Sequence, residues 1–307
     1  EFGRVTREAV YSFRARVALF NKDYALAKSD CKKVIDSGAY ELIPNYEDLF
    51  NSVERGYMSK ECIFMTYNSY NPPYCNGNPA LIYFVGRGVT GGWGGEVPTY
   101  DLVNEYEVKD PRKVHTILSH GDIFPKKDGN EEVHDYTGYD NFTKLQSRKH
   151  YVDHFRRPDA GLKQTDWSYY HIRYADVLLM YAEAEVRKTG TVPSVAAINA
   201  VNQVRKRAGL SDLPSVTTNT KDAFLNAILI ERGHEFFYEG NRKIDLIRFN
   251  KYAQEMYKAK GIMPTHQYMP IPNYAVEQAV SYGKELKQTW ERPGWAEDKS
   301  KAQQSIN

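Results

Sequence analysis

The chain has 307 residues, of which 41% are hydrophobic and 26% charged, and its formal net charge is +2. This composition is ordinary for a globular protein, and the length suits one large domain or two smaller ones. The near-neutral charge argues against a nucleic-acid surface, and no apolar run approaches the roughly 18 residues of a membrane-spanning helix.

Residues 1–50 carry the pattern of a helical hairpin. The runs VTREAVYSFRARVALF (5–20) and YALAKSDCKKVIDSG (24–38) are separated by the turn NKD. Apolar residues recur at helical spacing in the second run, and Gly38 is a natural C-terminal stop. Two short helices with small residues at their seam predict a tetratricopeptide-type hairpin.

The middle segment, residues 51–165, differs from the helical ends. It is rich in Gly, Pro, Asn and Tyr and holds two short β-like runs, CIFMTY (62–67) and LIYF (81–84). Further on, DLVNEYEVKDPRKV (101–114) predicts a charged helix and a turn. Because loops carried on a rigid scaffold are where binding usually resides, we predict that this segment carries the ligand-facing surface.

One stretch of the middle segment, GRGVTGGWGGEVP (86–98), matches the dinucleotide fingerprint G-x-G-x-x-G letter for letter. That fingerprint works only where the glycines open a helix whose amides meet a pyrophosphate. Here further glycines and Pro98 follow at once, and each interior Gly costs a helix roughly 1 kcal/mol and Pro about 3 kcal/mol. We therefore predict a glycine-rich loop with no nucleotide and no other cofactor.

Residues 166–307 return to a helical pattern. Three runs carry apolar residues at helical spacing: 171–188, 194–210 and 220–240. The last run begins on a Thr220 cap and is expected to end at Gly240. We predict a mostly α fold, with tetratricopeptide-like helical hairpins as the scaffold and a loop-rich, weakly β middle segment that carries the ligand surface.

The C-terminal helices also carry alternating acidic and basic residues. Glu231, Glu235 and Glu239 are four residues apart, a spacing that would stack three carboxylates on one helix face and raises the question of acid–base chemistry. Arginines alternate with them, so we interpret the set as ion pairs between helices that hold the scaffold. The members are Arg173, Glu183, Arg205, Glu231, Arg232, Glu235, Arg242, Asp245 and Arg248.

Several ordered motifs resemble the SusD/RagB family over nearly the whole chain. They are VPTYDLVNEYEVKDPR, RYADVLLMYAEAEV, AAINAVNQVRKRAGL, ILIERGHEFFYEGNRKIDLIRFN and MPIPNYAVEQ. The resemblance implies a single SusD-like domain over residues 1–307. It also implies a surface lipoprotein of the outer membrane that captures nutrients, usually glycans, and passes them to a SusC-like TonB-dependent transporter.

The chain departs from the family pattern at its start. The family has an N-terminal portion with a signal peptide, a lipidated cysteine and further helices, whereas this sequence begins at a later tetratricopeptide-like helix. We expect that portion to be missing here, and any membrane attachment to run only through a lipid anchor on it.

The glycine-rich loop supplies the best candidate for sugar binding. A sugar ring has an apolar C–H face and a hydroxyl edge, so binding takes a flat aromatic platform and polar groups at the edge. Trp93, flanked by glycines, is the predicted platform, although it could instead pack under the loop. The other predicted ligand contacts are Tyr70, Tyr74, Tyr83, Asn71, Asn76, Arg87 and Glu96.

No metal site and no catalytic site is predicted. His150 and His154 have helical metal-pair spacing, but Tyr151 replaces the glutamate of the zincin motif and no third ligand is identifiable. The carboxylates of DGNEEVHD (128–135) lack the spacing of an EF-hand loop. No nucleophile motif is recognisable, so we do not expect an enzyme. A bridge between Cys62 and Cys75 is left open.

Three classes of function remain after this comparison of motifs. The first is a glycan-binding surface lipoprotein, and the second is a family member that captures peptides or another nutrient. The third is a helical-repeat adaptor that binds only another protein, or an unrecognised hydrolase. An exposed arc of aromatic residues would favour glycan binding, and a groove with free strand edges would favour peptide capture. An apolar concave helical face would favour the adaptor.

Overall fold

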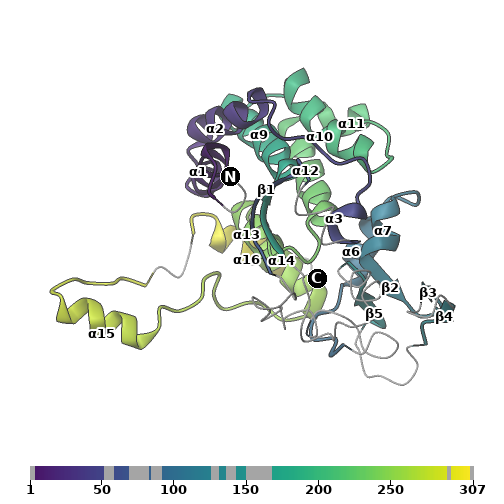
Figure 1. The fold of residues 1–307 in the computed structure, drawn as a ribbon. Helices are drawn as coiled ribbons and strands as arrows, with labels where there is room; N and C mark the ends of the chain where they lie inside the picture. Colours follow the sequence, from purple (N-terminus) through teal and green to yellow (C-terminus); the bar gives the residue numbers. More distant parts are fainter. Residues whose placement is uncertain are drawn as a thin grey trace. The chain divides into compact units, whose positions relative to one another are not determined.

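The computed structural model describes residues 4–51, 59–68, 83, 92–125, 131–135, 143–149, 168–288 and 292–304. The chain divides into two compact units, Glu1–Gly240 and Asn241–Asn307. Both consist mainly of helices, as the sequence predicts (Figure 1).

The first unit begins with the predicted helical hairpin, made of α1 (Arg7–Phe20) and α2 (Tyr24–Asp36). The side chains of Thr6 and Asp23 cap the two helices, each accepting a hydrogen bond from the backbone N–H three residues on, at 3.1 and 3.0 Å. Small residues dominate the buried face of α1, which lets the helices lie close together: Ala9, Ser12, Ala15, Ala18 and Leu19.

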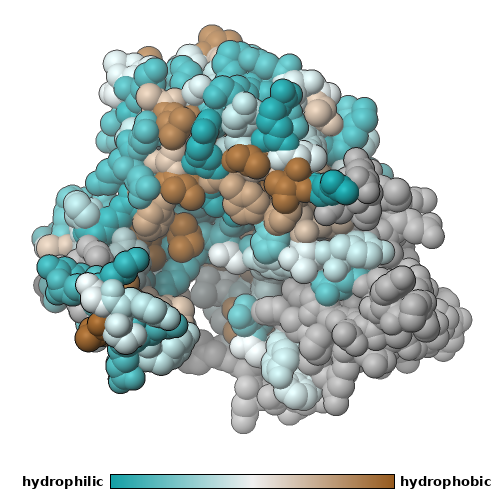
Figure 2. All heavy atoms as spheres, turned by 60° about the vertical axis from the view of Figure 1, so that its left-hand side comes forward, coloured by the Kyte–Doolittle hydropathy of each residue, from teal (hydrophilic) through white to brown (hydrophobic). Residues whose placement is uncertain are grey.

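The outer face of α1 keeps apolar side chains in contact with water. Val10 is 53% exposed and Val17 is 59% exposed. Figure 2 turns the side of the molecule that carries α1 forward, and hydrophobic residues gather on it. Helix α1 therefore buries one face only, against α2 and α9.

The core of the first unit lies around α9 (Tyr174–Thr189), which packs against α2, α10 and α12. Twelve of its sixteen residues are buried, so nearly every face of this helix is covered. Of the helices packed against it, α10 spans Val195–Arg207 and α12 spans Lys221–Glu235. The short helix α11 (Ser215–Thr218) contacts α12. The predicted Thr220 cap is confirmed, since its hydroxyl accepts from Ala223 N at 3.1 Å.

The described strands form three two-stranded antiparallel sheets. Strand β1 (Cys62–Thr66), which was predicted, pairs with β6 (Tyr169–Arg173). The other two pairs are β2 (Ile117–Ser119) with β5 (Leu145–Ser147), and β3 (Ile123–Pro125) with β4 (Glu131–Val133).

The predicted helix and turn at 101–114 are also present. Helix α6 (Tyr100–Glu105) is followed by a turn and then by a second short helix, α7 (Pro111–Thr116), while α3 (Asp48–Asn51) follows the N-terminal hairpin. The second predicted strand, 81–84, lies outside the described residues except for Tyr83, which is helical.

Two predicted helix boundaries are wrong. The run 171–188 was expected to be helical throughout, but residues 171–173 belong to β6, because pairing with β1 overrides the helical spacing. The run 220–240 leaves the helix at Glu235, since the chain then turns and Tyr238 takes a φ of +59°. This turn, residues 236–240, carries Glu239 away from the face of α12.

The second unit has its own small core. Its helices are α13 (Arg242–Arg248), α14 (Tyr252–Lys260), α15 (Asn273–Ser281) and α16 (Trp295–Gln304). Trp295, Ala253 and Ala302 are buried where α14 meets α16. The Asp298 carboxylate accepts from the N–H of Ala253 at 2.8 Å and so satisfies the first turn of α14. Across the described parts of both units, no helix has the length and apolar character needed to span a bilayer.

Candidate functional site

Trp93 and Tyr83 form an exposed aromatic corner. Their ring centroids are 4.9 Å apart with an interplanar angle of 81°, the edge-to-face arrangement that aromatic quadrupoles favour. Trp93 is 48% exposed and Tyr83 is 50% exposed. Trp93 is therefore not packed under the loop, and ring surface is open to water at both residues.

The loop that carries Trp93, residues 92–99 (the Trp93 loop), is not helical, as its glycines predict. Gly94 takes a φ of +59°, a conformation that favours glycine. The N–H of Gly95 donates to the carbonyl of Tyr83 at 2.8 Å. A Cβ on Gly95 would lie 3.1 Å from that carbonyl oxygen, so glycine permits the close approach that brings the two rings together.

The Trp93 loop is held at its far end as well. The carbonyl of Glu96 accepts a hydrogen bond from the Tyr238 hydroxyl, while the Glu96 residue itself remains exposed. Thr99 caps α6, since its hydroxyl accepts from Leu102 N at 3.4 Å. The loop is thus fixed at Gly95, at Glu96 and at the start of α6, and it leaves about half of the Trp93 surface exposed.

Three of the predicted contact residues can therefore be placed, namely Trp93, Tyr83 and Glu96, and the structure brings the first two into ring contact. The remaining predicted contacts lie outside the described residues: Tyr70, Asn71, Tyr74, Asn76 and Arg87.

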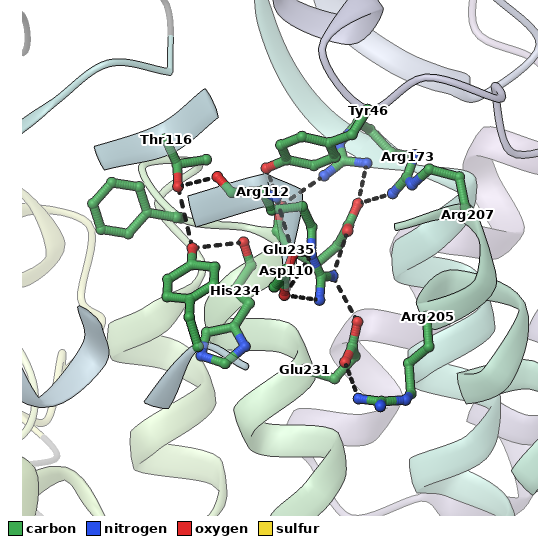
Figure 3. Close-up of polar contacts among 12 residues, drawn as sticks. Tyr46, Asp110, Arg112, Thr116, Arg173, Arg205, Arg207, Glu231, His234 and Glu235 are labelled. Atoms are coloured by element: carbon green, nitrogen blue, oxygen red, sulfur yellow. Dashed lines mark hydrogen bonds and ion pairs between the residues drawn. The ribbon is translucent and has the colours of Figure 1, made fainter. Parts of the chain in front are cut away.

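A buried charge network is centred on Glu235, and Figure 3 shows part of it. At its centre the Glu235 carboxylate pairs with Arg112 at 3.0 Å, with Arg173 at 2.9 Å, and with Arg207. Within the described ranges, five buried carboxylates and five cations with buried side chains make up the network: Glu61, Asp110, Glu231, Glu235 and Glu239, with Arg112, Lys149, Arg173, Arg205 and Arg207.

The network joins segments that are far apart in the sequence. Arg173, at the end of β6, pairs with Glu61 at 2.5 Å and with Glu239 at 2.8 Å. Arg112, on α7, donates to Glu231 at 2.6 Å. Since both arginines and all three carboxylates are buried, the pairs fix the sheet, α7 and α12 to one another.

The pKa values of Glu235 and Lys149 in the network are set by burial and by the opposite charges beside them. Burial alone would raise the pKa of Glu235, but the guanidinium groups of Arg207, Arg173 and Arg112 hold it well below its ordinary value. Lys149 behaves differently: burial lowers its pKa to about 8, against the opposing pull of Glu239. Its ammonium donates to the carbonyl of Phe237 and to Glu239, both at 2.6 Å.

These contacts confirm the structural interpretation of the C-terminal charges. Glu231 and Glu235 lie on α12 as predicted, whereas Glu239 lies beyond its end and reaches the network through the turn. Each of the three carboxylates is buried and paired with a cation, so none is available as an acid or base towards a sugar. Elsewhere in the predicted set, Arg232 pairs with Asp176 of α9 at 2.6 Å and so joins two helices as predicted. Arg248 pairs with Asp245 at 2.9 Å within α13 itself, so this pair does not join two helices.

The described residues contain no group of three or more His, Cys, Asp or Glu side chains that would hold a metal ion. His150, His154 and Asp128 lie outside the described residues. Cys31 and Cys62 are free thiols, and Cys75 again lies outside the described part of the chain.

Sequence reasoning missed Tyr238, Arg112 and Lys149. Arg112 had a local signal, because Asp110 caps α7 and holds the Arg112 side chain at 2.7 Å within the run KDPR. Lys149 comes from an irregular segment with no periodicity, and Tyr238 lies in the run 220–240, whose spacing predicted a helix where the structure has a turn.

Comparison with known proteins gives consistent matches. A sequence model of the SusD family matches residues 60–292. SusD-like protein P2 of Formosa agariphila is 26% identical over 290 residues, covering 85% of this chain and 55% of that protein. The starch-binding protein SusD of Bacteroides thetaiotaomicron is 24% identical over 314 residues, covering 83% of this chain and 54% of that protein.

A solved structure shows the same fold. The crystal structure of a SusD-like carbohydrate binding protein from Bacteroides fragilis matches with a TM-score of 0.69 and 24% identity, covering 82% of this chain and 54% of that chain. The chain spans about half the length of the curated relatives it matches. These matches agree with the resemblance carried by the ordered motifs.

Proposed function

This chain belongs to the SusD family, and from that premise we propose that it is the glycan-binding part of a cell-surface nutrient-capture protein. The aromatic corner of Trp93 and Tyr83 is the proposed platform for a sugar ring. The proposal is supported by the starch-binding and carbohydrate-binding relatives and by the exposure of the two rings.

The observation that carries the proposal is the geometry of the corner. Two half-exposed rings meet edge to face, so a sugar that lies on the indole face also meets the side of the phenol. The apolar C–H face of a pyranose matches such a surface, and stacking on it removes apolar area from water. The Glu96 residue is exposed next to this surface and can accept from hydroxyls at the ring edge.

Further contacts are proposed from the Tyr- and Asn-rich segment that precedes the loop. Their amide and phenol groups both donate and accept, which suits sugar hydroxyls. The residues with these groups are Tyr70, Asn71, Tyr74 and Asn76, and Arg87 is proposed in addition as a donor only.

We propose that capture takes place at the outer-membrane surface and that the glycan passes to a SusC-like TonB-dependent transporter. The family resemblance supports this step. A lipid anchor is the proposed means of attachment. We also propose that no hydrolysis accompanies binding, because the carboxylates of α12 are occupied by cations.

The experiment is a glycan array followed by calorimetric titration of the tightest binder against the native protein and Trp93→Ala. We expect the substitution to cost about 1–3 kcal/mol of binding free energy, the effect of deleting a large aromatic contact. The melting temperature should stay unchanged, since Trp93 is an exposed loop residue.

Tyr282→Ala is the matched control, because Tyr282 is an aromatic residue exposed by 73% in the other compact unit. Its affinity should equal that of the native protein. Unchanged affinity in Trp93→Ala, or no glycan bound by the native protein anywhere on the array, would contradict the proposal.

A further inference from the structure

Tyr238 has an unusual backbone for a large residue. Its φ is +59°, in the left-handed region that bulky side chains rarely adopt. Such a conformation persists only where the surroundings over-determine it, and it often marks a functional site.

The turn around Tyr238 is fixed by buried contacts on either side. Lys149 donates to the carbonyl of Phe237 at 2.6 Å. On the other side, Glu239 is bound by Arg173 at 2.8 Å, and its carbonyl accepts from the Tyr169 hydroxyl at 2.7 Å. The charge network thus binds both residues that flank Tyr238 and holds the turn that carries it.

The side chain of Tyr238 contacts the Trp93 loop. The Tyr238 hydroxyl donates to the carbonyl of Glu96, three residues after Trp93. Its ring packs against Phe237, with centroids 4.4 Å apart, and against the apolar cluster that includes Val103 just beyond the loop. Burial raises the pKa of the Tyr238 phenol well above its usual range, so the hydroxyl keeps its proton and remains a donor at physiological pH.

We propose that Tyr238 is a positioning residue: it transmits the rigidity of the charge network to the Trp93 loop and so sets the orientation of the aromatic corner. The inference rests on the proposed function, because the orientation matters only if the corner holds a sugar. Tyr238 touches no ligand in this account. It acts through the backbone of the loop.

The test uses the native chain labelled with 5-fluorotryptophan, with Tyr238→Phe as the variant. The chain has four tryptophans, so ¹⁹F NMR gives four resonances, and Trp93→Phe identifies that of Trp93. Tyr238→Phe removes only the hydroxyl. We expect the Trp93 resonance to shift or broaden without any glycan present, while the resonance of buried Trp295 stays in place.

Affinity is measured on the same samples with maltoheptaose, laminarihexaose, cellohexaose, xylohexaose and mannohexaose. For the tightest binder of this panel we expect a loss of about fivefold, in line with the net contribution of one hydrogen bond. The melting temperature should change no more than in the control.

Tyr170→Phe is the control, because the Tyr170 hydroxyl also donates to a backbone carbonyl, that of Leu49 at 2.9 Å, but away from the Trp93 loop. It should leave both the Trp93 resonance and the affinity unchanged. A Trp93 resonance that Tyr238→Phe does not move overturns the positioning role, and so does a moved resonance with unaltered affinity. If no panel glycan binds even the native protein, the glycan-binding proposal fails for these sugars while the resonance alone decides whether Tyr238 positions the loop.

Discussion

The Trp93 loop and the charge network lie in the same compact unit but are stabilised in opposite ways. The loop is held by a few backbone hydrogen bonds and leaves Trp93 48% exposed. The network buries Glu235 completely and surrounds it with three arginines. One region exposes apolar surface to a ligand, whereas the other pairs its buried carboxylates with cations inside the protein.

This difference separates the two jobs that the chain must do. Residues of the network that do not bind the turn 236–240 are expected to change the free energy of unfolding and to leave glycan affinity unchanged. Residues of the loop are expected to change affinity and leave stability alone. A variant of either region that changes both the free energy of unfolding and the glycan affinity would contradict this separation. Tyr238 is the exception, because it links the two regions.

Replacing Glu235 should produce the largest effect on stability. Glu235→Ala leaves Arg112, Arg173 and Arg207 short of a buried partner, and breaking a buried pair in this way costs about 3–5 kcal/mol. Urea denaturation measures the loss. Affinity of the remaining folded protein should equal that of the native protein.

Glu285→Ala is the contrasting variant, because Glu285 has a side chain 73% exposed and pairs with Lys287 at the surface. It should change the free energy of unfolding by less than about 0.5 kcal/mol. Native-like stability of Glu235→Ala combined with lost binding would place Glu235 in the ligand site instead.

The next largest effect is a pH dependence of the free energy of unfolding, which arises from Lys149. Its pKa in the folded protein is about 8, below the ordinary 10.5 expected for the unfolded chain. Between these two values the unfolded chain binds more protons, so the free energy of unfolding rises with pH across this window. The stabilisation is complete above 10.5 and is lost as the pH falls through 8.

The measurement compares the native protein with Lys149→Met at pH 7.5 to 10.5 by urea denaturation. The difference in unfolding free energy between the two proteins should change by roughly 3 kcal/mol over this range, the equivalent of the pKa difference. A difference that stays flat with pH would show that Lys149 titrates normally and lies closer to water than its burial indicates.

The helical scaffold was the part most readily predicted from the sequence, because its signals are local. Thr220 begins α12 as a cap, and the apolar spacing of the N-terminal run marks α1 and α2 within two residues. The prediction failed where a distant partner decides the outcome. Residues 171–173 pair with β1, more than a hundred residues away, and no local pattern announces that contact.

The candidate site was predicted only in part, for the same reason. Trp93 was identified by its flanking glycines, and its exposure agrees with that interpretation, although its contact with a sugar remains a proposal. Tyr238 was not identified, because its role depends on a positive φ and on a carbonyl 142 residues away in the sequence.

The smallest effect is expected from the glycine that closes the aromatic corner. Gly95→Ala places a Cβ 3.1 Å from the Tyr83 carbonyl, so the loop must shift by a few tenths of an ångström and the two rings separate. We expect glycan affinity to fall by about 1 kcal/mol, within the range of a lost aromatic pair, and the melting temperature to stay the same.

Gly190→Ala is the contrasting glycine substitution, which should change stability and not affinity. Gly190 ends α9 at a φ of +73° with open space around it, so alanine there costs about 1 kcal/mol of stability through backbone strain. Its glycan affinity should not change. If Gly95→Ala lowered stability and left affinity intact, the loop would belong with the scaffold.

The most direct measurement is a crystal structure of the native protein with the oligosaccharide that binds most tightly. We predict a sugar ring lying parallel to the Trp93 indole at van der Waals distance, about 4 Å, with Tyr83 at its side and the charge network unchanged. A sugar bound elsewhere on the chain, with Trp93 still bare, would contradict the account, and so would a sugar hydroxyl displacing an arginine from Glu235.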